Sequence, residues 1–532
     1  MIPALHHSPV GLPLRHFLIV ALGLGAVLGA SARTVELTVL HTTDLHGHIW
    51  PTEDYDGRAD VGGFLRCAAR IEALRAEHPN TLLIDCGDTF QGSPESYVTG
   101  GSLLIDGLNV LRYDAWVIGN HEFDWGVPAL RRLYEQAEIP VLAGNVYFRS
   151  PEQSWLPSLR PYVLRDVEGV RVAIIGLTTP GIPRWSRPHL LEGAMFQRSV
   201  PALQAIMPRV KADRADIVIV ALHQGYKHFG DDFANEIQSI ARSFPEIDVL
   251  IGGHTHTPVE DLRIGEVLYT QAGYHGIWLG RVDLVYDTVR KHVTDKKAVL
   301  EVMDARVPYH AGLLERWRKE LNRAEKVLNE VIGDLPERLD PAPDGLGMSS
   351  MQQTITRAIA EGTGAELVLH GSLNNRPVPA GPLRYRAVWD IVPYENTIGI
   401  ASLTPQEIRI ILEENFSRSL SPHSLGPYGF RFTVARGEGD RPRIGELRDA
   451  EGQTLHARKR YRVAMNSYVL ASGGERYVET RRLVEQPSAR LEMLDVDTRS
   501  LVADWIRRQY PVRRKSEPVA PVVVDEAAEA QP

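Results

Sequence analysis

The sequence predicts an α/β domain followed by an α+β domain. Its 532 residues, 43% hydrophobic and 24% charged, have a globular composition and are long enough for two or more domains. In the first half, short apolar runs alternate with helical patterns, which is typical of a mostly parallel β sheet covered by helices. In the second half, strands and helices follow a long charged helix, which indicates a separate domain with its own core.

The net charge of −8 at pH 7 leaves no basic surface of the kind that nucleic acids or anionic membranes bind. We therefore expect no nucleic-acid partner, and an anionic substrate would need local positive charge from a few arginines or from metal. The two cysteines, Cys67 and Cys86, are too few for a disulfide scaffold. We expect two buried thiols and no catalysis by cysteine.

Residues 1–32 have the pattern of a signal peptide. Basic residues precede the apolar run 17–30, and the run ends in the small-x-small cleavage pattern of 30–32. The run is shorter than the roughly 20 apolar residues that span a bilayer. We expect cleavage after Ala32, a periplasmic or secreted protein, and no stable membrane insertion. The alternatives are an uncleaved anchor and a true start downstream of Met1.

Strands and helices alternate through the first half. Each expected strand is a short β-rich or apolar run, and each expected helix has apolar residues at helical spacing. The expected strands are 35–41, 81–85, 115–118, 216–222, 249–251 and 279–286. The expected helices are 62–78, 103–112 and 127–137.

Side chains that can bind a metal follow five of these strands. They are Asp44, His46, Asp88, Asn120, His223, His254 and His256. A single histidine near a loop is more often a surface residue than a ligand. Five coincidences at strand ends reverse that interpretation, because ligands in open α/β sheets bind beyond the carboxyl ends of the strands. The sequence therefore predicts a metal site at that edge.

The type and number of these side chains suit two divalent ions. Imidazole, carboxylate and amide oxygen are ligands for Zn, Mn or Fe rather than copper. Seven ligands, with one carboxylate shared, fill two adjacent coordination spheres. Two ions roughly 3.5–4 Å apart hold a bridging hydroxide and clamp the oxygens of an in-line displacement. That chemistry hydrolyses phosphoesters.

The motifs D-x-H, G-D-x-x-x-G, G-N-H-E-x-D, H and G-G-H-x-H, in this order, resemble those of the calcineurin-like metallophosphoesterases. More narrowly, the chain from about residue 35 to 510 resembles the exported two-domain 5′-nucleotidases and UDP-sugar hydrolases of bacteria. The resemblance implies helix-covered β sheets in the first domain and an α+β substrate domain of 5′-nucleotidase type in the second. It also implies the ligand sets: Asp44, His46 and His256 on one metal, Asn120, His223 and His254 on the other, and Asp88 bridging both.

The resemblance further implies that His121 faces the phosphoryl group and that Asp124 orients its ring. Together with Asn120, these two are the candidate catalytic residues. Asp124 has a second interpretation, as the N-cap of the helix expected over 127–137.

A charged amphipathic helix over 313–331, broken by Gly333 and Pro336, marks the boundary between the domains. A surface helix is the alternative, and the resemblance favours a linker. The expected organisation is a metallophosphoesterase domain over 33–305, a linker helix over 306–335, a substrate domain over 336–514 and a disordered tail over 515–532. The second domain is expected to contain helices 351–361, 405–416 and 500–510, and strands 366–370, 430–434 and 461–465.

The substrate pocket follows the family unevenly. Residues 392–396 match its P-F-x-N segment, and 466–475 resemble its N-x-F…G-G-D-G-Y segment with one extra residue before the glycines. Asn374 stands where the family has arginine, and the expected pocket phenylalanine is missing. The candidate substrate-binding residues are therefore Arg376, Tyr428 and Tyr468, with the arginine on phosphate or carboxylate and the tyrosines stacked on a base. The alternative is that both tyrosines are ordinary half-buried residues.

We therefore expect an exported two-metal hydrolase of phosphate esters, a 5′-nucleotidase or nucleotide-sugar hydrolase that acts on a small nucleotide-like molecule. We expect a monomer or a weak oligomer. Two alternatives on the same scaffold are a cyclic-nucleotide phosphodiesterase and a thiosulfohydrolase-like enzyme. An alternative of another class is a non-catalytic secreted binding protein, which would not need all seven ligands.

Overall fold

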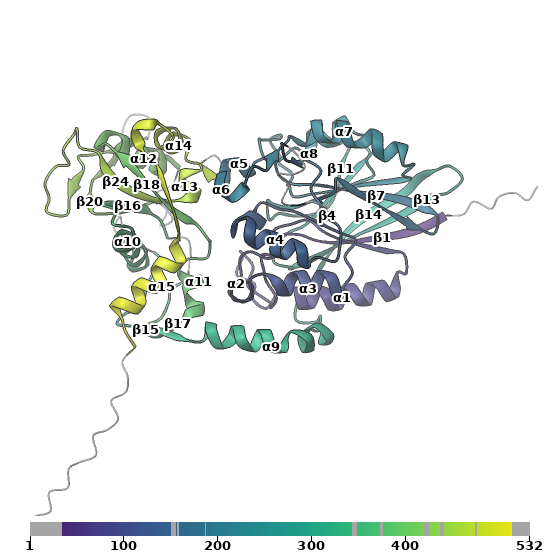
Figure 1. Cartoon of the computed structure of the whole chain (residues 1–532), viewed down its shortest axis with the longest axis horizontal. Helices are drawn as coiled ribbons and strands as arrows, with labels where there is room; N and C mark the ends of the chain where they lie inside the picture. Colours follow the sequence, from purple (N-terminus) through teal and green to yellow (C-terminus); the bar gives the residue numbers. More distant parts are fainter. Residues whose placement is uncertain are drawn as a thin grey trace, which may run out of the picture.

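The chain folds into two domains that lie side by side along its long axis, as Figure 1 shows. The computed structural model describes residues 34–149, 156, 159–186, 188–342, 348–372, 376–418, 425–436, 441–473 and 476–512. The expected signal peptide, the expected tail and Asn374 lie outside the described residues. In the described part, no helix is long and apolar enough to cross a membrane.

The first domain contains two six-stranded sheets, where the βαβ pattern had indicated one. The first sheet has the order β14 (His292–Val302), β13 (Trp278–Asp287), β1 (Thr34–Thr42), β2 (Thr81–Asp85), β3 (Ala115–Val117) and β4 (Val141–Leu142). The second has the order β11 (Pro258–Ile264), β12 (Val267–Ala272), β10 (Val249–Gly252), β9 (Ile217–Leu222), β7 (Val170–Leu177) and β6 (Tyr162–Val167). In the first sheet β1 to β4 run parallel, and β13 is antiparallel to both of its neighbours. In the second sheet β12, β10, β9 and β7 run parallel, and the edge strands β11 and β6 are antiparallel. The expected mostly parallel, helix-covered architecture is confirmed.

The two sheets pack against each other through a shared apolar core. Val39 and Ile84 of the first sheet belong to the same buried cluster as Ile174, Ile219 and Ile251 of the second. Side chains of a strand point alternately to its two faces, so the remaining apolar residues need a cover on the outer faces. The helices α1 (Phe64–Glu77), α3 (Ser102–Val110) and α4 (Gly126–Gln136) cover the first sheet, and α7 (Ser199–Ala212) and α8 (Ile237–Ser243) cover the second. Cys67 and Cys86 are both buried free thiols, as expected.

Helix α9 (Ala311–Leu328) connects the two domains. Its apolar residues recur at helical spacing. Trp317 packs in the core of the first domain, whereas Leu328 packs in the core of the second. The helix ends before the expected residue 331, because β15 (Val331–Leu335) begins there and pairs with β17 (Gly381–Arg384). One helix thus belongs to both cores, and the exact domain boundary stays a prediction.

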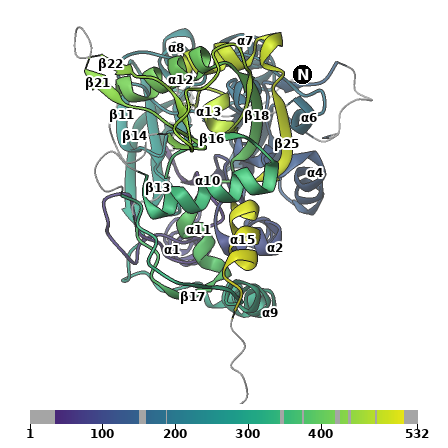
Figure 2. The ribbon, with the colours of Figure 1, turned by 90° about the vertical axis from the view of Figure 1, so that its left-hand side faces the viewer.

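The second domain is built on one five-stranded sheet with helices on both faces (Figure 2). Its order is β19 (Gly426–Tyr428), β16 (Leu367–His370), β24 (Tyr461–Asn466), β18 (Thr397–Leu403) and β25 (Glu492–Asp497). Helices α10 (Ser350–Thr363) and α15 (Thr498–Gln509) pack on one face, and α12 (Pro405–Arg418) and α14 (Val478–Val484) on the other. The α+β class is confirmed.

One expected strand of this domain, 430–434, is divided in two. Residues Phe430–Arg431 (β20) pair with β23 (Arg448–Asp449), whereas Val434–Arg436 (β21) pairs with β22 (Pro442–Ile444). The β-rich run is continuous in sequence, but its two ends pair with different strands. Which strands pair depends on the tertiary structure and is not encoded in the run itself.

Candidate metal centre and interdomain cavity

The side chains that the sequence predicts as metal ligands follow strands of both sheets. Those from the first sheet follow β1, β2 and β3, and those from the second sheet follow β9 and β10. Each of these strands is buried and ends at the same edge of the sandwich, where the chain turns into a loop. The fold therefore brings together seven side chains that are as far apart in sequence as Asp44 and His256.

Five of the seven residues have a left-handed backbone. The φ angles are 50° for Asp44, 46° for His46, 52° for Asp88, 71° for His254 and 53° for His256. Such angles are uncommon for residues other than glycine and are kept only where the surrounding structure enforces them. Strain of this kind concentrates at functional sites, and here it lies on residues whose side chains converge.

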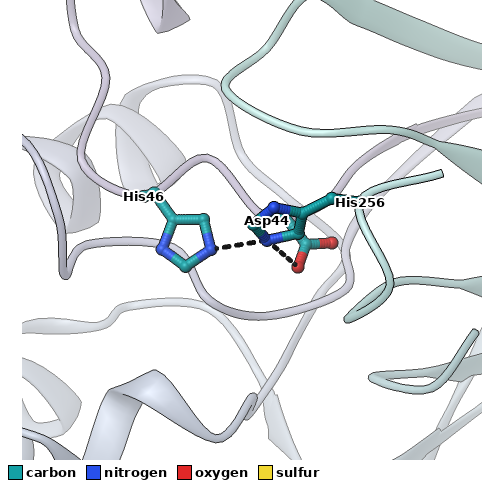
Figure 3. Close-up of side chains that lie close together, drawn as sticks. All are labelled: Asp44, His46 and His256. Atoms are coloured by element: carbon teal, nitrogen blue, oxygen red, sulfur yellow. Dashed lines mark hydrogen bonds and ion pairs between the residues drawn. The ribbon is translucent and has the colours of Figure 1, made fainter. Parts of the chain in front are cut away.

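Asp44, His46 and His256 form one group, shown in Figure 3. The Nε2 atom of His256 lies 3.0 Å from Nε2 of His46 and 3.3 Å from Oδ1 of Asp44. Asp44 is fully buried, and both of its carboxylate oxygens accept a hydrogen bond from the backbone N–H of His254 at 3.0 Å. The lone-pair atoms of three side chains thus face one another across a few ångströms.

Asp88, His223 and His254 form a second group next to the first. The Nε2 atom of His223 lies 3.0 Å from Oδ2 of Asp88 and 3.1 Å from Oδ1 of Asn120. The same oxygen of Asp88 lies 3.8 Å from Nε2 of His46, so its carboxylate stands between the groups. A carboxylate that binds both metal ions would have to occupy this position between the groups.

Burial sets the protonation of two of these rings. It lowers the pKa of His254 to about 3 and that of His46 to about 4. Both are therefore neutral at pH 7, which is the form that binds a metal. Burial alone would raise the pKa of Asp88, but nearby His223 and His121 outweigh it and lower that pKa well below its usual range. The carboxylate is thus ionised and able to bind a cation.

His121 lies beside these groups and is held by Asp124. Its Nδ1 atom is 2.6 Å from Oδ2 of Asp124, and its Nε2 atom is 4.0 Å from Oδ2 of Asp88. Burial opposes the protonated ring, but Asp124 and Asp88 raise the pKa of His121 to about 10. The ring is 35% exposed, so a substrate can reach it.

The N-cap interpretation of Asp124 is wrong. Helix α4 begins at Gly126, its N-cap is Trp125, and no side chain caps it. The carboxylate of Asp124 is instead bound to His121, which lies in the short 3-10 turn His121–Phe123. A hydrogen bond to a ring that can carry positive charge is stronger than one to a neutral amide, which explains the choice.

Glu122 joins two loops of the candidate centre, and no role was predicted for it from the sequence. It is fully buried, and its carboxylate accepts hydrogen bonds from the backbone N–H groups of Gly119 (2.6 Å), Asp88 (2.9 Å) and Thr89 (2.7 Å). It therefore ties the loop after β2 to the loop after β3, and so fixes Asp88 relative to Asn120. Its position in the motif G-N-H-E-x-D, between the candidate catalytic residues His121 and Asp124, could have indicated a role.

A cavity of about 290 Å³ opens between the two domains beside His121. The first domain contributes Asn120, His121, Asp124, Trp185, Ser186, Lys227, Asp232, Phe233, Ala234, Asn235 and His254 to its wall, and the second contributes Glu395, Asn396, Ser467, Tyr468, Ala471 and Gly473. Trp185 had not been considered from the sequence. Its ring stacks on His254, with centroids 5.1 Å apart, and meets Phe233 edge to face.

The three candidate substrate-binding residues lie in different places. Tyr468 is in the cavity wall, is 41% exposed and packs over Gly473. Tyr428 lies in β19 and packs against the core under α10, away from the cavity wall. Arg376 forms an ion pair with Glu53 of the first domain and is likewise not in the wall. Their roles as substrate ligands stay predictions, and the geometry favours Tyr468.

The chemistry of the donor set fits divalent metal ions. Four imidazoles, two carboxylates and one amide oxygen are a borderline-to-hard set. Within each group, the possible ligand atoms lie within 4.8 Å of one another. A helix-covered sandwich with such a centre at its loop edge, next to a cavity with a charged histidine, defines a metal-dependent hydrolase.

Two family models match the chain. Residues 37–258 match the calcineurin-like phosphoesterases, and residues 331–480 match the C-terminal domain of 5′-nucleotidases. The chain belongs to the family that combines these two domains, and it is a metal-dependent phosphoric ester hydrolase.

Three known proteins are similar to this chain over most of its length. The protein UshA of Yersinia enterocolitica is 26% identical over 503 residues, which cover 85% of this chain and 88% of UshA. A 5′-nucleotidase structure from Staphylococcus aureus, itself named as putative, superposes with a TM-score of 0.75 at 22% identity and covers 90% of this chain and 98% of that one. A sulfate thiohydrolase, SoxB of Thermus thermophilus, superposes with a TM-score of 0.61 at 18% identity over 91% of this chain and 96% of that one. The two structures show the fold alone.

Proposed function

We propose that this hydrolase is a 5′-nucleotidase or nucleotide-sugar hydrolase that uses two divalent ions. The observation that carries the proposal is that the Asp88 carboxylate lies between two ligand groups, 3.8 Å from His46 and 3.0 Å from His223, beside the interdomain cavity. Relatives named 5′-nucleotidase, from Homo sapiens and Vibrio vulnificus, support the nucleotide as substrate. A non-catalytic binding protein would not need the strained backbone that holds these ligands in place.

Asp44, His46 and His256 would hold one ion, Asn120, His223 and His254 the other, and Asp88 both. The ions, when bound, would supply the attacking water and neutralise the charge of the phosphoryl oxygens. The chain itself keeps the two groups at a fixed distance. Glu122 contributes to this, because it joins the loops that carry Asp88 and Asn120.

His121 would act on the phosphoryl group or on the leaving oxygen. Asp124 binds Nδ1, and Nε2 lies 4.0 Å from Oδ2 of Asp88, in a residue that lines the cavity. A protonated ring there can stabilise the charge of the transferring group and give its proton to the leaving oxygen. Asp124 keeps the ring in that orientation and maintains its charge.

The nucleoside would lie in the interdomain cavity, between walls of different domains. Tyr468 offers an aromatic face from the second domain, and Trp185 and Phe233 form an apolar wall on the first. Stacking on such faces tolerates different bases. Lys227 is also in the wall and offers a positive charge to a second phosphate or to a sugar-phosphate group.

A substrate panel tests this function. The purified protein is offered nucleoside 5′-monophosphates, UDP-glucose, cyclic nucleotides, a nitrophenyl phosphate and a thiosulfate ester. Released phosphate and sulfate are measured separately, and the organic products are identified by chromatography. We expect phosphate release from a 5′-nucleotide or cleavage of the nucleotide sugar to be fastest. Fastest turnover of a cyclic nucleotide would show a phosphodiesterase, and sulfate release would show a thiosulfohydrolase on the same scaffold.

Export is a further part of the proposal and rests on the sequence of residues 1–32. N-terminal sequencing of the protein recovered from outside the cytoplasm should begin after Ala32. Recovery of uncut protein in the membrane fraction would instead show an anchor.

A further inference from the structure

Tyr55 touches a candidate metal ligand from the side that faces away from the centre. Its hydroxyl oxygen lies 2.9 Å from Nδ1 of His256. The other nitrogen of that ring, Nε2, faces Asp44 and His46 at 3.3 and 3.0 Å. Nε2 of His256 therefore faces the candidate metal position, and Nδ1 faces Tyr55.

In two other candidate ligands, the ring nitrogen that faces away from the centre contacts a hydrogen-bond acceptor. The Nδ1 atom of His46 lies 3.0 Å from the backbone carbonyl of Gln91, and that of His223 lies 2.8 Å from the carbonyl of Cys86. A carbonyl can only accept, so each of these rings carries its hydrogen on Nδ1 and its lone pair on Nε2. In His256, a side-chain hydroxyl takes the place of the carbonyl.

We propose that Tyr55 is a positioning residue for His256. The Nδ1–H group of His256 donates to the hydroxyl oxygen of Tyr55, which fixes the tautomer with the lone pair on Nε2 and sets the ring orientation. Outer partners of this kind raise the metal affinity of a histidine ligand. The inference rests on the proposed function in one respect, that His256 is a metal ligand.

The loop that carries Tyr55 is held by contacts other than the hydrogen bond to His256. The Tyr55 ring stacks on that of Tyr274, with centroids 4.3 Å apart, and its backbone N–H donates to the Tyr274 hydroxyl at 3.0 Å. Backbone hydrogen bonds of 2.8 and 3.1 Å between Thr52 and Val61 close the loop at its base. Removal of the Tyr55 hydroxyl alone should therefore leave the loop where it is.

The same loop provides a matched control. Glu53, two residues before Tyr55, forms an ion pair with Arg376 of the second domain. Glu53→Gln weakens this contact and leaves the Tyr55 hydroxyl untouched. A variant of a remote tyrosine, Tyr147→Phe, loses a hydroxyl on an exposed residue of β5 (Val146–Tyr147).

The test is a zinc titration of the metal-free full chain against a chromophoric chelator. We expect Tyr55→Phe to weaken one of two bound ions by about 10–100-fold and to leave the other unchanged. Glu53→Gln and Tyr147→Phe should bind as the wild type does. The thermal unfolding temperature of metal-free Tyr55→Phe should equal that of the wild type, since the stacking on Tyr274 and the backbone hydrogen bond to its hydroxyl remain.

The outcomes separate this inference from the proposed function. His256→Ala should lose one ion. If it does and Tyr55→Phe binds both ions normally, the positioning role is overturned while the ligand set stands. Equal weakening in Glu53→Gln and Tyr55→Phe would also overturn the role, because loop position would then set the affinity. If His256→Ala keeps both ions at normal affinity, the ligand set of the proposed function is itself wrong.

Discussion

The indole nitrogen of Trp125 donates a hydrogen bond to Oε2 of Glu395, which lies 270 residues further along the chain in the second domain. The other oxygen of Glu395 accepts from Arg499 at 2.8 Å, and the side chains of this ion pair are 7% and 3% exposed. Trp125 directly follows Asp124, the partner of His121. The two domains therefore meet one residue away from the candidate catalytic pair.

Replacement of Glu395 should destabilise the second domain. In Glu395→Ala, Arg499 would keep the carbonyls of Val392 and Pro393 and the face of Trp389 as partners, but would lose its counter-charge while it remains buried. We expect a loss of about 3 kcal/mol in the free energy of unfolding, because an uncompensated buried charge is costly. Glu395→Gln keeps an acceptor for Trp125 and should lose less. Urea unfolding measures both, and an unchanged midpoint in Glu395→Ala would show that water screens the pair.

Removal of the metal should abolish hydrolysis. We expect about two divalent ions per chain, because the two ligand groups meet at Asp88, and a strong chelator should stop turnover. Asp88→Ala should be the most damaging single ligand substitution, since its carboxylate serves both groups. Metal analysis alongside kinetics checks this. Full activity after exhaustive metal removal, or both ions retained in an active Asp88→Ala, would contradict the assignment.

His121→Ala should lower turnover by roughly 10²–10⁴-fold while the metal content stays the same. The reason is that His121 lies in the cavity wall and its Nδ1 is held by Asp124, so the ring can act on the substrate. Asp124→Asn should show a milder loss, because it disturbs only the orientation and charge of the ring. The loss should shrink for substrates with a good leaving group if the ring protonates it. Loss of an ion in His121→Ala would make His121 a ligand.

Tyr468→Ala should weaken the use of nucleotides by about 1–3 kcal/mol in kcat/KM, the usual value of stacking on a base. A nitrophenyl phosphate, which is too small to reach both domains, should be nearly unaffected. Tyr428→Ala is the matched control, because that ring packs in the core outside the cavity wall. Equal losses on both substrates would make Tyr468 structural, and a selective loss in Tyr428→Ala would place the base near Tyr428 instead.

Asp106 should make the docking of α9 on the first domain pH-dependent. Its carboxylate accepts from Arg316 at 2.6 Å and from the indole of buried Trp317 at 2.7 Å. Burial alone would raise the pKa of Asp106, but these two bonds lower it below its usual value. Because the folded-state pKa of Asp106 is below its unfolded-state value near 3.8, the ionised carboxylate stabilises the fold at pH values above 3.8. This stabilisation is lost as the pH falls through the folded-state pKa.

We expect Asp106→Ala to reduce the free energy of unfolding by about 1–3 kcal/mol at pH 7, since it leaves the Trp317 N–H without its acceptor. The difference from the wild type should narrow below about pH 4, where the unfolded-state carboxyl protonates. Asp106→Asn keeps an acceptor for the Trp317 N–H, so its free energy of unfolding should lie between those of the wild type and Asp106→Ala. Denaturant titrations at pH 7 and pH 3.5 measure this, and a difference that is independent of pH would show that charge is not involved.

The sequence by itself determined the elements and the chemistry of the centre. Strands such as 81–85 were bounded correctly, because apolar runs and turn residues are local signals. The residues after those strands were predicted as metal ligands from type and position alone, and the structure brings Asp44, His46 and His256 into one group and Asp88, His223 and His254 into another. This succeeds because the carboxyl ends of parallel strands meet at one edge, so order along the chain predicts nearness in space.

Only the tertiary structure decided how the strands divide between two sheets and what lines the cavity. Tyr428 and Tyr468 look alike in sequence, yet only Tyr468 reaches the wall, because β19 and α13 (Ser467–Leu470) face different neighbours. Trp185 and Tyr55 carry no motif. Their positions follow from stacking on His254 and Tyr274, which are distant in the chain. Contacts of this kind depend on how whole elements pack, and local patterns of residues do not encode that packing.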